Sequence, residues 1–404
     1  MKVAYVVPRY GTEFHGGAEY AARMLAERLV AQRGWEVEVL TTCAVDTQTW
    51  ADRVPAGTTV EGGVTVHRFH VDSGRHHRFD AISRRVLSAP TRASMADQVR
   101  WIEMQGPRSD ALLGAVADTD ADLVAFYPYL FHPTFHGVPR VGPRRSVFHP
   151  AAHDEPPLRL PAFGRVFAGV GGFVFQTESE RAMVEERFGI GATPQLVLGL
   201  GVEEGPGRPE DALARLGLDD RPYLVYVNRI DHGKGTGALV DFFAAYKSAR
   251  PGPLRLVLAG DVVHAPEPHD DVVLVGRVDE ETKWGLLRGA MAMVNPSAFE
   301  AFSLLTIEAW TAGVPVVVNG RCGPTREHCV RSGGGLWYES FAEFVAVLDH
   351  LAGDPGLRAA LGAAGHDYVR ANFEWPALID RYAAFLEHLA ERSRRPLSRR
   401  SVVV

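Results

Sequence analysis

The chain has 404 residues, a formal net charge of -6 and 46% hydrophobic residues. At about 150 residues per domain, this length predicts two domains, and the composition excludes collagen, low-complexity disorder and a disulfide scaffold. The acidic balance gives no global positive field, so we expect no nucleic-acid partner. The three cysteines, Cys43, Cys322 and Cys329, lack metal-site spacing and are typical of a reducing cytoplasm. Because no apolar run approaches the ~18–20 residues needed to cross a bilayer, we expect a cytoplasmic protein.

The first 200 residues alternate strand and helix patterns. Apolar strands are predicted at 2–8 and 36–42, with a helix between them that carries apolar residues at helical spacing. Residues 64–71 predict a hairpin or an edge strand, and the polar segment 72–110 predicts a long loop or short helices. Strand patterns resume at 122–129, 145–149, 172–177 and 195–200.

A second series of strands and helices follows residues 201–208, whose glycine, proline and acidic residues predict a linker. Strands are expected at 223–228, 254–260, 272–276, 292–296 and 314–319, and helices at 236–249, 280–290 and 305–312. Short strands rich in β-branched residues are typical of parallel sheets buried on both faces. We therefore predict an α/β fold of two doubly wound, Rossmann-like domains facing each other across a cleft, at 1–200 and 208–372.

Ligands of such sheets bind at the carboxyl ends of the strands, against helix N-termini. After the first strand, Gly16 and Gly17 stand where a helix begins, which frees backbone N–H groups or merely allows a tight turn. After strand 223–228, Arg229 and Lys234 flank a turn that opens a helix, a pattern suited to a diphosphate. Lys234 is one of only four lysines in the chain, which argues against a mere solvated loop.

Two glutamates follow strand 292–296. Glu300 precedes the next helix and is either a cap or a ligand group. Glu308 interrupts an apolar stretch of that helix, so it needs either a salt-bridge partner or a ligand such as ribose hydroxyls.

Metal and redox motifs are weak in this sequence. Prolines around His149 and His153 argue against metal ligation by these two histidines, and a polar-substrate contact suits His153 better. No dinucleotide fingerprint, P-loop, nucleophile elbow or zinc signature appears. We therefore predict no metal site and no cofactor.

These motifs resemble glycosyltransferase family 4, whose members have the two-domain GT-B fold. The most specific are Arg229-x4-Lys234-Gly235, then Pro296-Ser297, then Glu300-x7-Glu308. The stretches beginning at Gly16 and His153 also resemble that family.

The resemblance implies a retaining, metal-independent transfer of a sugar from a nucleotide-diphosphate sugar. Arg229 and Lys234 would hold the diphosphate, and backbone N–H groups would bind its distal phosphate near Phe302, Ser303 and Leu304. The backbone of the next three residues would contact the base: Gly276, Arg277 and Val278.

The sugar and ribose contacts also follow from the resemblance. Glu308 would accept hydrogen bonds from the ribose, and Glu300 would orient the transferred sugar. His153 would reach that sugar from the first domain, where Gly16 and Gly17 leave room for substrates. A last helix, 373–390, would pack back on the first domain.

Some features depart from the family or leave alternatives open. The family often has Glu-Gly-Phe-Gly where this chain reads Glu-Ala-Phe-Ser at 300–303, and residues 319–329 differ from its usual pattern. Stretches 105–107 and 153–157 resemble a branch among bacterial surface-polysaccharide enzymes. A phosphorylase, an epimerase or a catalytically silent sugar-nucleotide-binding protein remain as alternatives.

The acceptor is expected to be a sugar, a lipid-linked molecule or another small molecule. Peripheral contact with an anionic membrane at the inner face would involve a basic tail at 392–400 or a patch formed by Arg140, Arg144 and Arg145.

Overall fold

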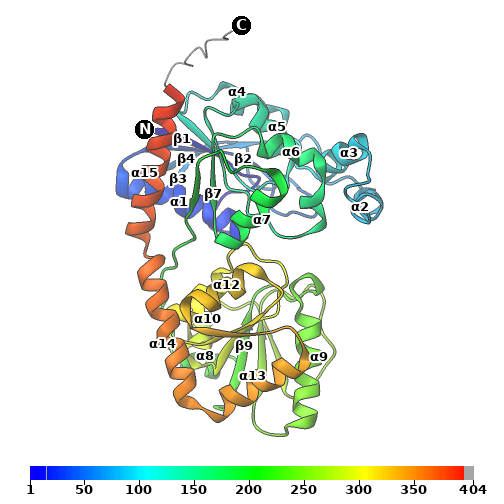
Figure 1. Ribbon diagram of the computed structural model, residues 1–404, viewed down its shortest axis with the longest axis vertical. Coiled ribbons are helices and arrows are strands. Elements are labelled where there is room, and N and C mark those ends of the chain that lie inside the picture. Colours follow the sequence, from blue (N-terminus) through cyan, green and yellow to red (C-terminus); the bar gives the residue numbers. More distant parts are fainter. Residues whose placement is uncertain (15, 395–404) are drawn as a thin grey trace. The chain divides into compact units, whose positions relative to one another are not determined.

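The computed structural model describes residues 1–14 and 16–394, which fall into two compact units (Figure 1). Unit 1 comprises residues 1–176, 180–198 and 379 onward, and unit 2 comprises 177–179 and 199–378. The division differs from the predicted boundaries, since 199–207 and 373–378 belong to unit 2. Packing explains the difference, because a Cβ atom on Gly199 would lie 2.4 Å from the Phe373 ring and one on Gly201 would lie 2.6 Å from the Trp375 ring.

Unit 1 is built on an eight-stranded sheet of order β3-β4-β2-β1-β5-β6-β7-β8. Its strands are β1 (Lys2–Val6), β2 (Glu36–Thr42), β3 (Gly57–Glu61), β4 (Val64–Phe69), β5 (Leu123–Phe126), β6 (Ser146–Phe148), β7 (Gly172–Phe175) and β8 (Gln195–Val197). All described pairings are parallel except the hairpin of β3 with β4. Apart from Lys2 at the start of β1, the central strands β1, β5 and β7 are apolar and buried, as strands covered on both faces are.

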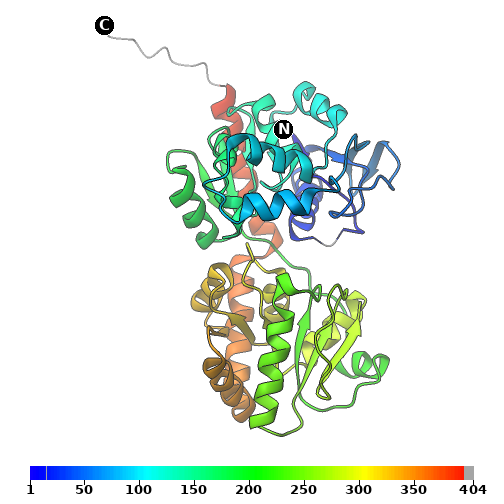
Figure 2. The same ribbon diagram turned by 90° about the vertical axis from the view of Figure 1, so that its right-hand side faces the viewer.

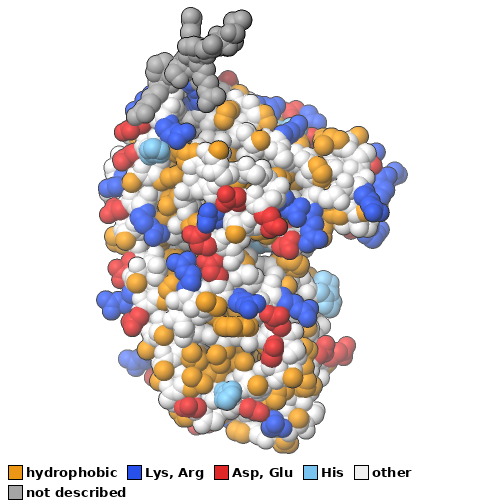
Figure 3. Space-filling view, viewed as in Figure 1, with side chains coloured by type: hydrophobic (Ala, Val, Ile, Leu, Met, Phe, Trp, Pro, Cys, Tyr) orange, Lys and Arg blue, Asp and Glu red, His pale blue; other side chains and the backbone are white. Residues whose placement is uncertain are grey.

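The helices of unit 1 lie on both faces of this sheet (Figure 2). They are α1 (Gly17–Arg33), α2 (Phe79–Leu87), α3 (Met95–Gln105), α4 (Asp110–Asp118), α5 (His132–Val141), α6 (Gly164–Phe167) and α7 (Glu178–Phe188). The segment 72–110, predicted as a loop or short helices, thus contains α2 and α3. Lys and Arg side chains gather over this segment in the space-filling view (Figure 3), where exposed arginines include Arg84, Arg85, Arg92 and Arg100.

Unit 2 contains a parallel six-stranded sheet of order β11-β10-β9-β12-β13-β14. Its strands are β9 (Tyr223–Val227), β10 (Arg255–Ala259), β11 (Val272–Gly276), β12 (Ala292–Asn295), β13 (Val316–Asn319) and β14 (Gly335–Tyr338). Its helices are α8 (Pro209–Arg215), α9 (Thr236–Ala249), α10 (Glu280–Gly289), α11 (Leu304–Thr311), α12 (Gly323–Ser332), α13 (Phe341–Gly353) and α14 (Pro355–Asn372).

The last helix, α15 (Trp375–Arg394), begins in unit 2 and continues into unit 1. In unit 1 the buried hydroxyl of Tyr382 lies 3.0 Å from Tyr5 Oη and 3.0 Å from His149 Nε2. The His149 ring stacks on Tyr127 with 4.0 Å between centroids, and burial lowers the pKa of His149 well below its usual value. A buried polar cluster therefore fixes the register of this helix on the first sheet.

No described helix is long and apolar enough to cross a membrane. Part of the predicted basic tail lies at 395–404, outside the described residues. Arg394, which is described, pairs with Asp122 at 2.6 Å. In the predicted basic patch, Arg145 donates to the carbonyl oxygens of Thr119 and Ala121 at 3.0 and 3.1 Å, so its charge serves a structural contact.

Candidate functional site

The loop that leaves β9 is organised by Asp231. Its Oδ1 accepts the backbone N–H of Lys234 at 2.8 Å, and its carbonyl oxygen accepts the hydroxyl of Thr236 at 3.0 Å. The turn closes through Gly235, whose φ of 76° is left-handed. A Cβ at that position would lie 2.8 Å from the carbonyl oxygen of Pro296, so only glycine fits this approach of two loops.

Both predicted phosphate-binding cations of this loop have acidic partners. Arg229 forms an ion pair with Asp231, although 56% of the arginine side chain remains exposed. Lys234 Nζ lies 2.8 Å from Glu300 Oε1, and these side chains are 23% and 13% exposed. Burial by itself would raise the pKa of Asp231, but hydrogen bonds from Lys234 N–H and Arg229 outweigh it and lower that pKa. The structure therefore brings Arg229, Lys234 and Glu300 into one cluster.

The segment between β12 and α11 holds the second predicted group. Ser303 precedes the helix with φ 71° and ψ 83°, a conformation that costs a non-glycine residue energy. Its hydroxyl lies 2.9 Å from Asn295 Nδ2 and 3.0 Å from Thr306 Oγ1, and these contacts support the strained backbone. This geometry explains how serine stands where the family often has glycine.

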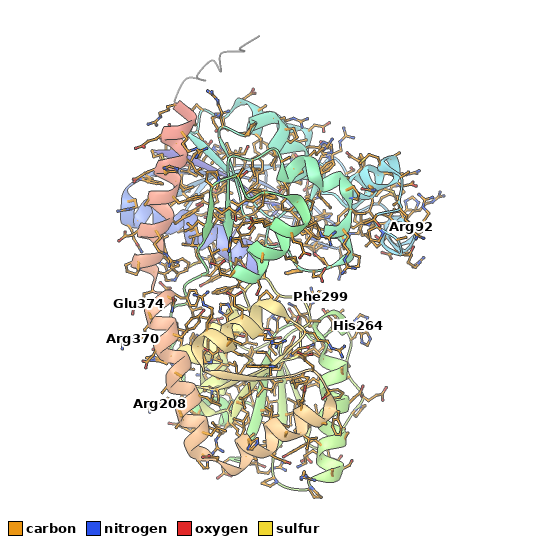
Figure 4. All side chains as sticks on the ribbon, in the orientation of Figure 1. Arg92, Arg208, His264, Phe299, Arg370 and Glu374 are labelled. Carbon is orange, nitrogen blue, oxygen red and sulfur yellow. The ribbon has the colours of Figure 1, made fainter. Side chains whose placement is uncertain are left out.

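The start of α11 has no side-chain cap. Phe302, Ser303 and Leu304 form the entry to this helix. Backbone N–H groups at a helix start lack partners within the helix, and the helix dipole places partial positive charge at this end. Phe299, 41% exposed, lies in the same loop, and Figure 4 shows it at the end of unit 2 where His264 also lies. The loops after β9, β10 and β12 meet at this edge because all three strands run parallel.

Glu308, on α11, has an ion-pair partner that the sequence analysis did not identify. Lys283 Nζ of α10 lies 2.8 Å from Glu308 Oε1 and 2.8 Å from Glu280 Oε2. Burial raises the pKa of Glu308, and the ammonium group partly offsets that rise. Burial alone would lower the pKa of Lys283, but the charges and hydrogen bonds of Glu308 and Glu280 outweigh this effect, so the pKa of Lys283 is raised. The salt-bridge alternative for Glu308 is thus realised, and its contact with ribose hydroxyls stays a prediction.

The predicted base-binding backbone follows β11. Gly276 has φ 72°, and its carbonyl oxygen accepts the N–H of Gly260 at 2.8 Å. Arg277 forms two hydrogen bonds to Asp261, at 3.0 and 2.6 Å, and both side chains are exposed. Val278 continues the loop toward α10.

In unit 1, Gly16 is the N-cap residue of α1, and Gly17 is its first residue. Gly17 is exposed, and a Cβ there would meet no heavy atom within 4 Å. The nearby Arg9 forms an ion pair with Glu19 and donates to the carbonyl oxygen of Val45 at 3.1 Å. A Cβ on Gly16 would lie 2.1 Å from Glu19 Oε2, so of the two glycines only Gly17 borders open space, and their role in substrate binding stays a prediction.

His153 lies in a loop after β6. Its Nδ1 is 3.6 Å from Glu155 Oε1, and 32% of the side chain is exposed. Two residues earlier, Ala151 has a φ of 48°, and the N–H of Ala152 donates to buried Glu180 at 2.7 Å. Burial raises the pKa of Glu180 to about 7, against hydrogen bonds from Gln176 and Ala152.

Comparison with known proteins shows which family the residues of unit 2 match. Residues 210–367 match the family model described as "Glycosyl transferases group 1". The chain is 29% identical over 401 residues to D-inositol 3-phosphate glycosyltransferase of Frankia alni, covering 91% of this chain and 93% of that protein. By this match, residues 210–367 form a domain of the group 1 glycosyltransferase family. This retaining nucleotide-sugar glycosyltransferase carries Arg229, Lys234, Glu300 and Glu308 within the part that the family model matches.

Two solved structures show the same fold as this glycosyltransferase. Sucrose-phosphate synthase from Thermosynechococcus elongatus superposes with a TM-score of 0.70 at 18% identity, covering 96% of this chain and 98% of that chain. A trehalose-6-phosphate structure from E. coli, bound with UDP-2-fluoro glucose, gives a TM-score of 0.69 at 13% identity, with coverages of 96% and 99%. The fold predicted from the sequence, two Rossmann-like domains of the GT-B type, is confirmed.

Three residues that hold the predicted site residues of the two units in place were not predicted from the sequence. Asp231 shapes the loop at 228–235 that carries Arg229 and Lys234, here called the cation loop. Lys283 pairs with Glu308, and Glu180 accepts a backbone hydrogen bond from Ala152, beside His153. The scarcity of lysine was a signal for Lys283, as it was for Lys234. No sequence signal linked Glu180 to a residue 28 positions away.

Proposed function

We propose that this glycosyltransferase transfers a sugar from a nucleotide-diphosphate sugar to an acceptor hydroxyl, with retention and without a metal ion. The observation that carries the proposal is the cluster of Arg229, Lys234 and Glu300 beside the uncapped start of α11. Two cations and a helix N-terminus together suit a diphosphate better than any neutral ligand.

The diphosphate exchanges partners with the acidic groups of the site. Arg229 turns from Asp231 and Lys234 from Glu300 to the phosphate oxygens, and the N–H groups of Phe302, Ser303 and Leu304 hold the distal phosphate. Both cations then neutralise the charge that develops on the leaving group, which is where stabilisation lowers the barrier. They supply what a divalent cation supplies in metal-dependent transferases, so the proposal requires no metal.

The remaining contacts of unit 2 orient the donor. Glu308 accepts hydrogen bonds from ribose hydroxyls, and the backbone of Gly276, Arg277 and Val278 contacts the base. Glu300, released from Lys234, accepts hydrogen bonds from the transferred sugar. This arrangement leaves Lys283 to keep Glu308 ionised in a largely buried position.

The chemical step needs no protein nucleophile. The bond between the anomeric carbon and the phosphate oxygen breaks, and the acceptor oxygen bonds to that carbon on the same face. The acceptor proton passes to the departing phosphate oxygen, so charge and atoms balance. His153 holds the sugar from unit 1, where Gly16 and Gly17 leave space for the substrates.

We infer a sugar, a lipid-linked molecule or another small molecule as acceptor, in surface-polysaccharide or glycoconjugate biosynthesis. The Frankia alni relative is named for the small phosphorylated polyol D-inositol 3-phosphate, which supports an acceptor of that size. Peripheral contact with an anionic membrane belongs to the same proposal, through the basic tail at 392–400 or through the patch that contains the exposed Arg140 and Arg144.

Nucleotide binding tests the proposal directly. The purified protein is melted with UDP, GDP, ADP, dTDP or CDP, with and without EDTA, and a nucleotide at 100 times its Kd stabilises the fold by about 2.7 kcal/mol. We expect one nucleotide to act in the presence of EDTA, and Lys234→Ala and Glu308→Ala to abolish its effect. Arg326→Ala, which removes a surface pair with Glu339 in the same unit, is the matched control.

Two results would overturn parts of the proposal. If Lys234→Ala and Glu308→Ala bind the nucleotide as tightly as the parent, the donor site is elsewhere. If the nucleotide sugar binds but is neither hydrolysed nor transferred to any acceptor, the protein is a silent binder rather than an active enzyme.

A further inference from the structure

Two histidines and a glutamate form a cluster in unit 1 that has no role in the proposed transfer. His132 and His136 come from α5, and Glu103 comes from α3. His132 Nε2 lies 3.3 Å from Glu103 Oε2, and His136 Nε2 lies 2.6 Å from Glu103 Oε1. The side chains of His132, His136 and Glu103 are 4%, 23% and 36% exposed, so the cluster is anchored at one end and open to solvent at the other.

Helix geometry brings the two imidazoles together. Residues four apart lie on one face of an α-helix, and the two rings here have centroids 4.4 Å apart. Pro133 stands in the first turn of α5, where a missing N–H costs no helix hydrogen bond. On α3, the buried residues Trp101 and Ile102 fix the helix that presents Glu103.

We propose that Glu103, His132 and His136 bind a divalent ion of the zinc class, with water completing the coordination. Imidazole nitrogens and a carboxylate oxygen are a ligand set typical of zinc. Zinc bonds of ~2.0–2.1 Å place tetrahedral ligand atoms about 3.3 Å apart. One ligand atom from each of the three residues lies within 4.8 Å of the others. His132 and His136 now contact different oxygens of Glu103, at 3.3 and 2.6 Å, so the carboxylate and the more exposed ring must shift for one oxygen and both rings to reach this spacing.

The surroundings of the cluster fit a metal ligand set. Each Nε2 atom now donates to the Glu103 carboxylate, so a bound ion would replace those two protons and each ring would carry its proton on Nδ1. The buried Nδ1 of His132 has no hydrogen-bond partner among the described residues. Arg108 and Arg165 also act on the Glu103 carboxylate. Their positive charge weakens a cation site, so we expect moderate affinity and a role in tying α3 to α5.

A second cluster in unit 1, formed by Cys43, Asp52 and His70, is the less suitable site. Cys43 is fully buried, and burial together with the Asp52 charge raises the pKa of its thiol, which disfavours the thiolate that zinc needs. His70 is 73% exposed and bonded to Asp52 at 3.0 Å. This cluster provides an internal control.

Zinc titration of the full-length protein tests the proposal. After dialysis against a chelator, the parent is titrated with Zn²⁺ by calorimetry and with Co²⁺ by visible absorption. We expect one ion per chain with the intense d–d bands of a four-coordinate site, and Zn²⁺ at 100 times its Kd should raise the folded-to-unfolded ratio about 100-fold. His136→Ala and Glu103→Gln should each weaken binding at least tenfold. His70→Ala should bind as the parent does.

The outcomes separate the possible sites. Absence of binding to the parent, or equal binding by His136→Ala and Glu103→Gln, overturns the proposal. Loss of binding in His70→Ala alone assigns the ion to the Cys43 cluster and also overturns it. Melting curves without metal check that the His136→Ala and Glu103→Gln variants are folded. Because both side chains are partly exposed, we expect at least one of the two variants to fold as the parent does.

Discussion

The buried pair of Lys283 and Glu308 gives a sharp prediction about stability and pH. Its Nζ and Oε1 atoms are 2.8 Å apart, and the two side chains are only 14% and 19% exposed. Opposite charges about 4 Å apart attract by ~4 kcal/mol at an effective dielectric constant of ~20. Removing one partner of a buried pair typically costs about 3–5 kcal/mol. We therefore expect Lys283→Met to lower the free energy of unfolding by about that amount at pH 8.

The loss should shrink as the pH falls. In Lys283→Met the ammonium group no longer offsets the effect of burial, so the pKa of Glu308 rises further in the folded state. At intermediate pH the folded variant therefore binds a proton that the unfolded chain has lost. Where the folded state binds more protons, stability falls as the pH rises, by at most about 1.4 kcal/mol per pH unit for one group. Between pH 5 and pH 8 the difference from the parent should therefore grow from small to nearly its full value.

Urea unfolding at pH 5 and pH 8, followed by tryptophan fluorescence, measures this effect, since Trp284 and Trp310 lie on the two helices concerned. Lys283→Arg keeps the charge and should lose far less stability. The double variant Lys283→Met/Glu308→Gln removes both charges and should be more stable at pH 8 than Lys283→Met alone. An equal loss at both pH values, or none at pH 8, would refute this reasoning.

Three further predictions concern other positions. Gly235→Ala should lower stability by about 1–3 kcal/mol and abolish nucleotide-induced melting shifts, because a Cβ would strain the φ of 76° and crowd Pro296; unchanged shifts would contradict this. Glu180 has a pKa of about 7 when folded and near 4.5 when unfolded, so it makes stability fall as the pH rises through that window, and Glu180→Gln should flatten the parent's stability profile there. Tyr382→Phe should cost about 1–3 kcal/mol by removing hydrogen bonds to Tyr5 and His149 while nucleotide binding, measured by calorimetry, stays at the parent's level.

Much of the fold was predictable because its strands are buried on both faces. A continuous apolar segment such as β9 is typical of a central strand that is covered on both faces. The helix predicted at 236–249 coincides with α9. The strand β14, Gly335–Tyr338, was not predicted from the sequence. Its segment is short and follows glycines, and it becomes a strand through its pairing with β13. The last two helices of unit 2, α13 and α14, were likewise not predicted.

The site was predictable where one loop carries the chemistry and not where two elements meet. The spacing of Arg229 and Lys234 is local, but the pairing of Lys283 with Glu308 depends on how α10 packs beside α11. The histidines His132 and His136 are four residues apart, but this spacing was not singled out from the sequence, which was read as holding no metal site. The third cluster member, Glu103, lies 33 residues before His136 and joins the cluster only through the packing of α3 near α5.

The two ion pairs of the cation loop have a consequence for how fast a nucleotide arrives. Arg229 with Asp231 and Lys234 with Glu300 sum to zero charge, and the chain as a whole carries -6. An anionic ligand approaching from a distance therefore meets no attractive field, since steering requires a surface of opposite sign. Because salt screens the repulsion between an anionic ligand and a chain of charge -6, association should become faster as ionic strength rises. Free inorganic phosphate, which lacks ribose and base contacts, should rarely displace the internal carboxylates. At the proposed donor site, the internal ion pairs would therefore favour a complete nucleotide over phosphate alone before any sugar is recognised.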